Sequence, residues 1–332
     1  MNVSIIGAGS WGSGLAKILA DNNNEVMLFD KNEETVNEIN VKHTNSKLPN
    51  SVLPLNVKAT TDINYALDFS KVIILCVPTK VLRIVLKNIN ENLKSKKIFV
   101  NASKGIEPES LKRVSEIVKE EIKSELIEGF VALTGPSHAE EVIEQLLTMV
   151  CSVSENEEHA KLIQELFNNN EYFRVYTGSD LAGAELCGAI KNVYAIASGM
   201  LEGLGYGDNA KAALITRALV ELRKIVVALG GQEATVNGLT GVGDLIVTAT
   251  SHYSRNFQAG LKLASGCDLN EAVASISMVV EGARTAEAVY QVCEKMNLDC
   301  PIINAVYNII YKKKEVKEEI RQIMSRSLKQ EI

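Results

Sequence analysis

The chain has 332 residues, which is long for one domain and sufficient for two domains with separate cores. Hydrophobic residues make up 46% of the sequence, and no apolar stretch reaches the ~20 residues that a membrane span requires. The net charge of -6 argues against a nucleic-acid-binding surface. A strand pattern follows Met1 directly, without the features of a secretion signal, so we expect a cytoplasmic protein.

The cysteine and histidine patterns argue against two further classes of protein. The six cysteines form no CxxC pair and lie mostly in apolar runs, so we expect thiols in a reducing compartment rather than disulfides. The four histidines are not spaced as metal ligands, so we expect no metal site.

Apolar runs alternate with helical patterns through the first half of the chain. Runs typical of strands buried on both faces cover residues 2–6, 25–29, 72–77, 98–101, 130–133 and 149–153, with a further candidate at 172–176. The segments 81–92 and 111–123 carry apolar residues at helical spacing. This alternation predicts an α/β domain with a mainly parallel, doubly wound sheet.

The alternation of strand and helix patterns ends after residue 178, beyond which almost no segment has a strand pattern. Helices are predicted over residues 181–201, 210–229, 254–264, 285–296 and 316–327. We therefore expect a dinucleotide-binding domain over residues 1–179 and an all-helical C-terminal domain, for substrate binding and catalysis, over residues 180–332. The long apolar helix faces favour a homodimer.

A glycine motif lies between the first predicted strand and the helix that follows it. Gly7, Gly9 and Gly12 have the GxGxxG spacing, which provides a tight turn, close approach to a pyrophosphate and close helix–strand packing. Asp30 ends the second strand about 20 residues further on, where a carboxylate binds the ribose. We predict a Rossmann-type dinucleotide site. The alternative is a structural turn, with Asp30 as a helix cap.

Asp30 and Lys31 influence which dinucleotide binds. A carboxylate that accepts from the ribose hydroxyls favours NAD, because it repels a 2′-phosphate. Lys31 could instead pair with that phosphate and admit NADP. The cofactor is therefore NAD or NADP, and we favour NAD.

Two lysines are candidates for chemistry. Lys191 lies in the middle of an almost wholly apolar helix, where desolvation lowers a lysine pKa toward neutrality and so suits a general acid or base. The alternative is a lysine whose stem reaches solvent. Lys104 follows a predicted strand at its carboxyl end, where open α/β sheets place their ligands, although a surface-loop lysine is an equal alternative.

Polar residues also gather at two turns. Gly135 shapes a strand-end turn in which Ser137 can cap the next helix. In the helical half, Asp244 follows two glycines, where it can cap a helix or bind a lysine. Arg255 lies near a helix start, where a guanidinium and free N–H groups form an anion clamp, although a surface ion pair is the commoner fate of an arginine. Together with the dinucleotide motif, these residues predict hydride transfer to a small anionic substrate.

With these residues assembled, the chain closely resembles the bacterial glycerol-3-phosphate dehydrogenases that use NAD or NADP. The matching segments span almost the whole chain and are GAGSWG, SKG, GPSHAEEV, LCGAIKNVYAIASG, GYGDNAKAALITR, GLTGVGDLIVTATSHYSRN and VVEGARTA. By this resemblance, Lys191 is the catalytic proton donor and acceptor. Substrate contacts fall on Lys104, Gly135, Ser137, Lys191, Asp244, Ser254, Arg255 and Asn256. Cofactor contacts fall on Ser10, Trp11, Lys31, Lys104, Ala139, Arg255, Val279 and Glu281.

The resemblance implies interconversion of dihydroxyacetone phosphate and sn-glycerol 3-phosphate, supplying glycerol 3-phosphate for phospholipid synthesis. The sequence departs from the family pattern at Asp30, where NADP users often carry a smaller residue, and at Ala218 and Leu147, where glycine and proline are common. Two alternatives remain at this stage. One is a related hydroxyacid dehydrogenase that takes a carboxylate, and the other is a redox sensor that binds NAD without turnover.

Overall fold

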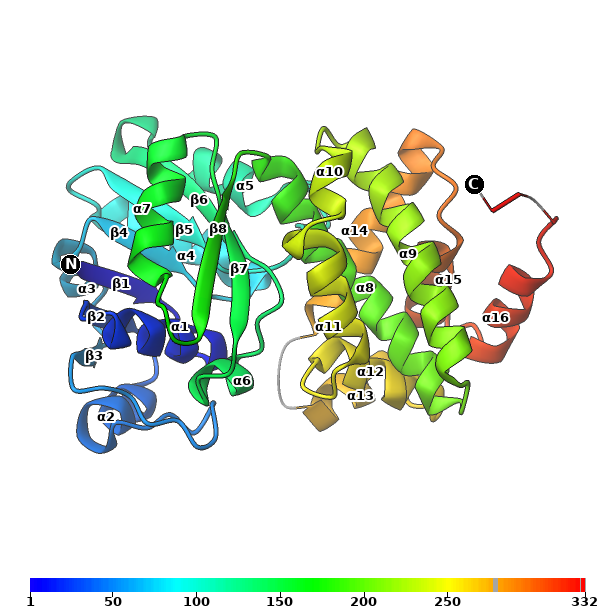
Figure 1. Ribbon diagram of the computed structural model, residues 1–332, viewed down its shortest axis with the longest axis horizontal. Helices are drawn as coiled ribbons and strands as arrows, with labels where there is room; N and C mark the ends of the chain where they lie inside the picture. The colour runs from blue at the N-terminus through cyan, green and yellow to red at the C-terminus, as the bar shows by residue number, and fades with distance from the viewer. Residues whose placement is uncertain (277–279, 329, 332) are drawn as a thin grey trace.

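The chain consists of a sheet-containing half followed by a helical half in the computed structural model (Figure 1), which describes residues 1–276, 280–328 and 330–331. Within these residues one eight-stranded sheet spans the first half. Its strands are β1 (Asn2–Ile6), β2 (Glu25–Phe29), β3 (Val57–Thr60), β4 (Val72–Leu75), β5 (Lys97–Asn101), β6 (Ile127–Thr134), β7 (Thr148–Val153) and β8 (Phe173–Gly178). The connecting helices are α1 (Ser10–Asp21), α2 (Glu33–Lys42), α3 (Ile63–Phe69), α4 (Thr79–Asn92), α5 (Val114–Glu121), α6 (Ala139–Ile143) and α7 (Glu157–Phe167).

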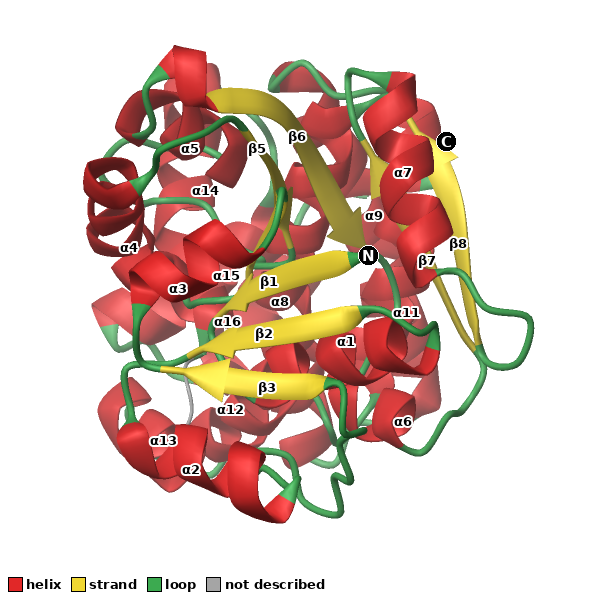
Figure 2. Cartoon of the chain, turned by 90° about the vertical axis from the view of Figure 1, so that its left-hand side faces the viewer, coloured by secondary structure: helices red, strands yellow, loops and turns green. Residues whose placement is uncertain are grey.

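The strand order is β3-β2-β1-β4-β5-β6-β7-β8. Strands β1 to β6 are all parallel, and Figure 2 shows β1, β2 and β3 side by side with the same direction. Strand β7 pairs antiparallel with β6, and β8 continues parallel to β7. The carboxyl ends of β1, β4, β5 and β6 therefore lie along one edge of the sheet.

Both faces of the sheet are covered, which explains why its strands are apolar at successive positions. Along β4, Val72 and Ile74 belong to one buried cluster, whereas Ile73 and Leu75 belong to the cluster on the opposite face. Because a strand turns alternate side chains to opposite faces, a strand between two helical layers needs apolar residues at both.

One buried helix, α8 (Leu181–Gly203), lies at the centre of the second half, and other helices pack around it. Helix α8 is buried along nearly its whole length and contacts α9, α11, α12, α14 and α15. Glycines permit the closest of these contacts, since a Cβ at Gly199 would lie 2.0 Å from the carbonyl oxygen of Phe257. The surrounding helices are α9 (Asp208–Ala228), α10 (Glu233–Val236), α11 (Asp244–Thr250), α12 (Arg255–Ala264), α13 (Leu269–Ile276), α14 (Glu281–Met296), α15 (Pro301–Lys312) and α16 (Val316–Met324).

The predicted fold class, a doubly wound α/β sheet followed by a helical region, is confirmed. The prediction missed β3 in the sheet and, in the helical half, α10, α11, α13 and α15. The predicted strand over residues 72–77 ends at Leu75, because the residues after it turn into the cavity described below. Among the described residues, no helix is both long and apolar enough to cross a membrane.

Candidate active site

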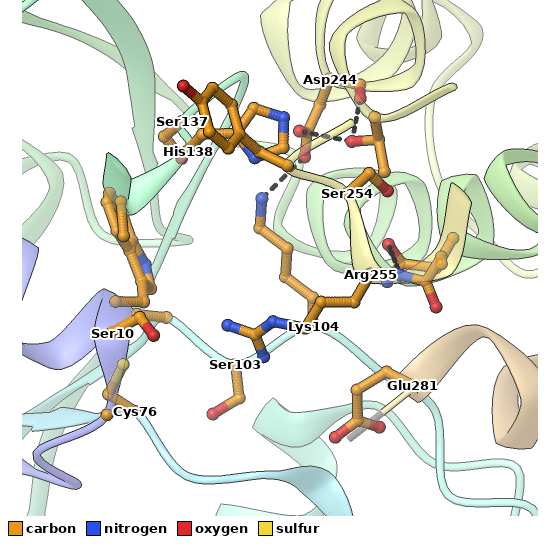
Figure 3. Close-up of a pocket in the computed structure, with 18 of the residues that line it drawn as sticks. Ser10, Cys76, Ser103, Lys104, Ser137, His138, Asp244, Ser254, Arg255 and Glu281 are labelled. Atoms are coloured by element: carbon orange, nitrogen blue, oxygen red, sulfur yellow. Dashed lines mark hydrogen bonds and ion pairs between the residues drawn. The ribbon is translucent and has the colours of Figure 1, made fainter. Parts of the chain in front are cut away.

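A cavity of about 400 Å³ opens where the carboxyl ends of β1, β4, β5 and β6 meet the helical half. The sheet half contributes the residues that directly follow these strands, and the helical half contributes residues of α8, α11, α12 and α14 (Figure 3). Predicted site residues that line the cavity are Gly9, Ser10, Trp11, Gly12, Lys104, Ser137, Ala139, Lys191, Asp244, Ser254, Arg255, Asn256 and Glu281.

The glycine turn has the geometry that a dinucleotide motif requires. Gly7 has a φ of +116°, and a Cβ at Gly12 would lie 2.0 Å from the Gly7 carbonyl oxygen, so both positions require glycine. A Cβ at Gly9, in contrast, would meet nothing within 4 Å. Gly9 therefore leaves open space in front of the N-terminus of α1, whose first N–H groups have no acceptor within the helix.

The residues around this turn fit a bound dinucleotide. The indole nitrogen of Trp11 is buried and has no hydrogen-bond partner in the described part of the chain. Cys76 and Ala139 also line the cavity and have small side chains. An open approach to a helix N-terminus, next to an unsatisfied buried donor, is what a pyrophosphate-containing cofactor uses.

Asp30 and Lys31 lie beyond the cavity lining, where the structure adds a residue that the sequence analysis missed. The Asp30 carboxylate accepts hydrogen bonds from the backbone N–H of Asn32 at 3.0 Å and from Lys47 Nζ at 2.9 Å. Lys31 is exposed and forms no ion pair among the described residues. The charge partner of Asp30 is therefore Lys47, which is 17 positions away and has no sequence pattern that links it to Asp30.

One buried carboxylate connects the two candidate lysines. Asp244, at the start of α11, is 1% exposed, and its Oδ2 accepts from Lys104 Nζ at 2.9 Å. Its Oδ1 accepts from Lys191 Nζ, which also donates to Thr248 Oγ1 at 2.6 Å. Lys104 reaches Asp244 across the cavity (Figure 3) and donates to the Gly135 carbonyl oxygen at 3.3 Å. Residues from three distant segments thus meet at one point.

The cluster places two ammonium groups beside one carboxylate. Burial is the largest influence on Lys191 and lowers its pKa, and the charge of Lys104 lowers it further, against the opposite effect of Asp244. Burial tends to raise the pKa of Asp244, but the two lysines together outweigh it and hold that pKa below its ordinary value. Asp244 therefore stays ionised, while the Lys191 proton becomes transferable closer to neutral pH.

The N-terminus of α12 adds a cation to the cavity. The Arg255 guanidinium makes no ion pair or side-chain hydrogen bond with another described residue, and burial lowers its pKa. Ser254 caps the helix by accepting from the Phe257 N–H at 3.3 Å. A guanidinium with free donors at a helix N-terminus suits a phosphate or carboxylate.

Asn256 and Asn192 fix the side of the cavity opposite the sheet. Asn256 Nδ2 donates to Asn192 Oδ1 at 2.9 Å, and Asn256 Oδ1 accepts from the Gly282 N–H at 2.9 Å. Asn192 is a further lining residue that the sequence analysis missed, although it directly follows Lys191. Thr248 was also missed, and its spacing of four residues from Asp244, one helical turn, is the signal that could have found it.

The remaining predicted residues have structural partners or lie elsewhere. Glu281 accepts from the backbone N–H of Thr79 at 3.0 Å and so joins α14 to the start of α4. Gly135 contributes its backbone rather than a lining side chain, because a Cβ there would lie 2.9 Å from Val150 Cα. Ser137 donates to the Gly135 carbonyl oxygen at 3.0 Å. Val279 lies outside the described residues.

His138 lines the cavity, although the sequence analysis did not assign it a role. Burial is the largest influence on it and, with the charges of Lys191 and Lys104, lowers its pKa to about 4. His138 is therefore neutral at physiological pH, and the lysines remain the cavity's candidate proton donors.

Comparisons with known proteins cover nearly the whole chain. A family model described as the NAD-dependent glycerol-3-phosphate dehydrogenase N-terminus matches residues 2–160, and the corresponding C-terminus model matches residues 180–321. A protein from Acholeplasma laidlawii named glycerol-3-phosphate dehydrogenase (NAD(P)+) is 47% identical over 100% of this chain and 99% of its own length. A protein of the same name from Listeria monocytogenes is 46% identical over 98% of this chain and 97% of its own.

The solved structures include a glycerol-3-phosphate dehydrogenase from Coxiella burnetii. It superposes with a TM-score of 0.92 at 33% identity and covers 98% of this chain and 99% of its own. Both halves of the molecule, including the segments that carry the lysine–aspartate cluster, lie within the matched regions. The chain therefore belongs to the family of NAD(P)-dependent glycerol-3-phosphate dehydrogenases.

Proposed function

We propose that the chain catalyses the interconversion of dihydroxyacetone phosphate and sn-glycerol 3-phosphate with NAD or NADP. The observation that carries this proposal is the cluster of Lys191, Asp244 and Lys104 in a cavity that also contains the glycine turn and Arg255. This arrangement provides a proton donor, a cofactor cradle and an anion clamp within one cavity.

Lys191 is the general acid of the reaction. The chemistry supplied by a bound NAD(P)H is hydride donation to the substrate carbonyl carbon. As that carbon is reduced, the Lys191 ammonium donates its proton to the developing alkoxide, and in the reverse direction the neutral amine accepts the hydroxyl proton. Asp244 and Thr248 hold Lys191 Nζ in place. The Lys104 ammonium stabilises negative charge on the same oxygen.

Arg255 is the main anchor of the substrate phosphate. Lys104 and Lys191 are both paired with Asp244, whereas the Arg255 guanidinium has no ion-pair partner among the described residues. A phosphate can therefore bind Arg255 without breaking an existing ion pair. Ser254 and Asn256 lie beside it on the first turn of α12, where the helix dipole also favours an anion. Holding the phosphate at one end fixes the carbonyl near Lys191 at the other. We also propose that Gly135 and Ser137 contact the substrate, and that the residues implied by the family resemblance contact the cofactor.

The wider biological role follows from this activity. We propose that a dinucleotide-binding domain ends at residue 179 and that the helical domain supplies substrate binding and catalysis. We further propose that the protein acts in the cytoplasm as a homodimer and provides glycerol 3-phosphate for phospholipid synthesis.

The test is oxidation of NADH and of NADPH, in parallel, by the purified protein with dihydroxyacetone phosphate. Turnover that depends on this substrate would support the proposal, and competition by glycerol 3-phosphate would separate it from a related hydroxyacid dehydrogenase. Binding of both cofactors without turnover on any phosphate substrate would contradict it and favour an NAD-binding sensor.

A further inference from the structure

The pair formed by Asp30 and Lys47 lies outside the catalytic cluster, beside the glycine turn. Asp30 directly follows β2, and its backbone N–H donates to the Thr60 carbonyl oxygen at the end of β3. Its carboxylate accepts from Asn32 N–H on one oxygen and from Lys47 Nζ on the other. The carboxylate is thus fixed at the strand end that holds the adenosine ribose in dinucleotide-binding sheets.

The backbone of Lys47 is anchored to the glycine turn itself. The Ser10 hydroxyl donates to the Lys47 carbonyl oxygen at 2.6 Å. Asn45, which is 1% exposed, accepts from the Lys47 N–H and donates to the Ala8 carbonyl oxygen and to Ser13 Oγ. The loop therefore presents the Lys47 side chain between the glycine turn and Asp30 by means of buried hydrogen bonds.

The contact between the two side chains is easily exchanged. Lys47 is 39% exposed and Asp30 is 14% exposed, and an ion pair at such a surface position contributes little net stability. The Lys47 ammonium can therefore leave Asp30 for a neighbouring anion without a large cost, while its anchored backbone keeps the side chain within reach of both. Lys31, in contrast, is exposed and its side chain forms no ion pair in the described part of the chain.

We propose that Lys47, rather than Lys31, recognises the 2′-phosphate that distinguishes NADP from NAD, and that Asp30 and Lys47 form an exchangeable pair that selects the cofactor. With NAD, Asp30 accepts from the ribose hydroxyl and Lys47 compensates its charge. With NADP, Lys47 turns from Asp30 to the phosphate and offsets the repulsion from the carboxylate. This inference rests on the dinucleotide site and is independent of the substrate proposed above.

The test is equilibrium binding of NADH and NADPH to the free enzyme, followed by the fluorescence of the reduced nicotinamide. Lys47→Ala is expected to weaken NADPH binding by about tenfold, the loss of one charge-assisted contact, and to change NADH binding by less than about twofold. The salt dependence of NADPH binding should fall in the same variant. Asp30→Asn is expected to act in the opposite direction, tightening NADPH and weakening NADH.

Two further lysine variants make the test specific. Lys42→Ala removes an exposed lysine from the last turn of α2, outside the cavity lining, and controls for a general loss of positive charge. Lys31→Ala tests the competing assignment. A larger loss of NADPH affinity in Lys31→Ala than in Lys47→Ala would overturn the proposal, as would an equal loss of both cofactors in Lys47→Ala. If the unmodified protein bound neither cofactor, the dinucleotide site itself would be wrong.

Discussion

Replacing Lys191 by alanine tests the proposed chemistry most directly. The change removes the ammonium that donates to Asp244 and Thr248. Asp244 keeps its ion pair with Lys104 at 2.9 Å, so the buried carboxylate is not left without a partner. The destabilisation should therefore stay below the ~3–5 kcal/mol that follows when a buried charge loses its sole partner. We expect a folded variant.

The rate effect should be larger than the stability effect. Loss of a positioned general acid lowers kcat by ~10²–10⁴, which corresponds to about 3–5 kcal/mol of transition-state stabilisation. Lys104 still offers positive charge to the oxygen, so we expect a loss of at least ~10² rather than complete inactivity. The Kd for NADH should change little, because the glycine turn and its neighbours remain intact.

The assay is NADH oxidation with dihydroxyacetone phosphate, combined with NADH titration to count folded sites. Lys97→Met is the matched control: Lys97 is also buried, but it lies away from the cavity and donates to the carbonyl oxygens of Leu67 and Ser70. Lys97→Met should retain the kcat of the unmodified enzyme per folded site. If Lys191→Ala turned over at a similar rate, or if both variants lost activity equally, Lys191 would not be the proton donor.

The pH profile gives a second readout of the same group. Reduction of the carbonyl requires the ammonium form, so kcat/KM in that direction should fall as pH rises through the Lys191 pKa, which burial has lowered. Oxidation of glycerol 3-phosphate requires the amine and should rise with pH over the same range. Profiles that run in the same direction for both reactions would exclude this assignment.

Other parts of the structure lead to three further predictions. Arg255→Ala should raise KM for dihydroxyacetone phosphate by at least about tenfold with a smaller effect on kcat, and an unchanged KM would place the phosphate elsewhere. Gly12→Ala should lower both Tm and NADH affinity, because its Cβ would lie 2.0 Å from the Gly7 carbonyl oxygen. Gly9→Ala should keep Tm and lower only NADH affinity, because its Cβ would meet no protein atom within 4 Å. Equal Tm values for the two variants would contradict this prediction. Burial raises the pKa of Glu185 to about 7 from 4.5, against the hydrogen bonds that Ser115 and Arg113 donate to it, so the fold is stabilised at low pH and this contribution is lost as pH rises from about 4.5 to about 7. Glu185→Gln should therefore gain up to about 3 kcal/mol relative to the unmodified protein between about pH 5 and pH 8 in urea unfolding, and a pH-independent difference would refute this.

The local sequence determined most strands of the sheet, the change to a helical second half and the glycine turn of the cofactor site. The two-faced apolar runs of the first half predict strands buried between helical layers, because a parallel sheet requires apolar residues on both faces. The GxGxxG spacing, set between a strand-like run and a helical pattern and followed by Asp30, predicts a tight turn, and the structure confirms that Gly7 and Gly12 require glycine there. The position of Lys191 in the middle of an apolar helix predicts a buried amine, and the structure confirms that it is 3% exposed rather than reaching solvent.

The tertiary structure alone decided which charges meet. Asp244 joins Lys104 and Lys191 across separations of 140 and 53 residues, and no spacing rule connects such positions. The same holds for Lys47, which pairs with Asp30 across 17 residues because its loop is tied to the glycine turn. Helical and strand periods act over a few residues, whereas ion pairs depend on distances that only the packed sheet and helices set.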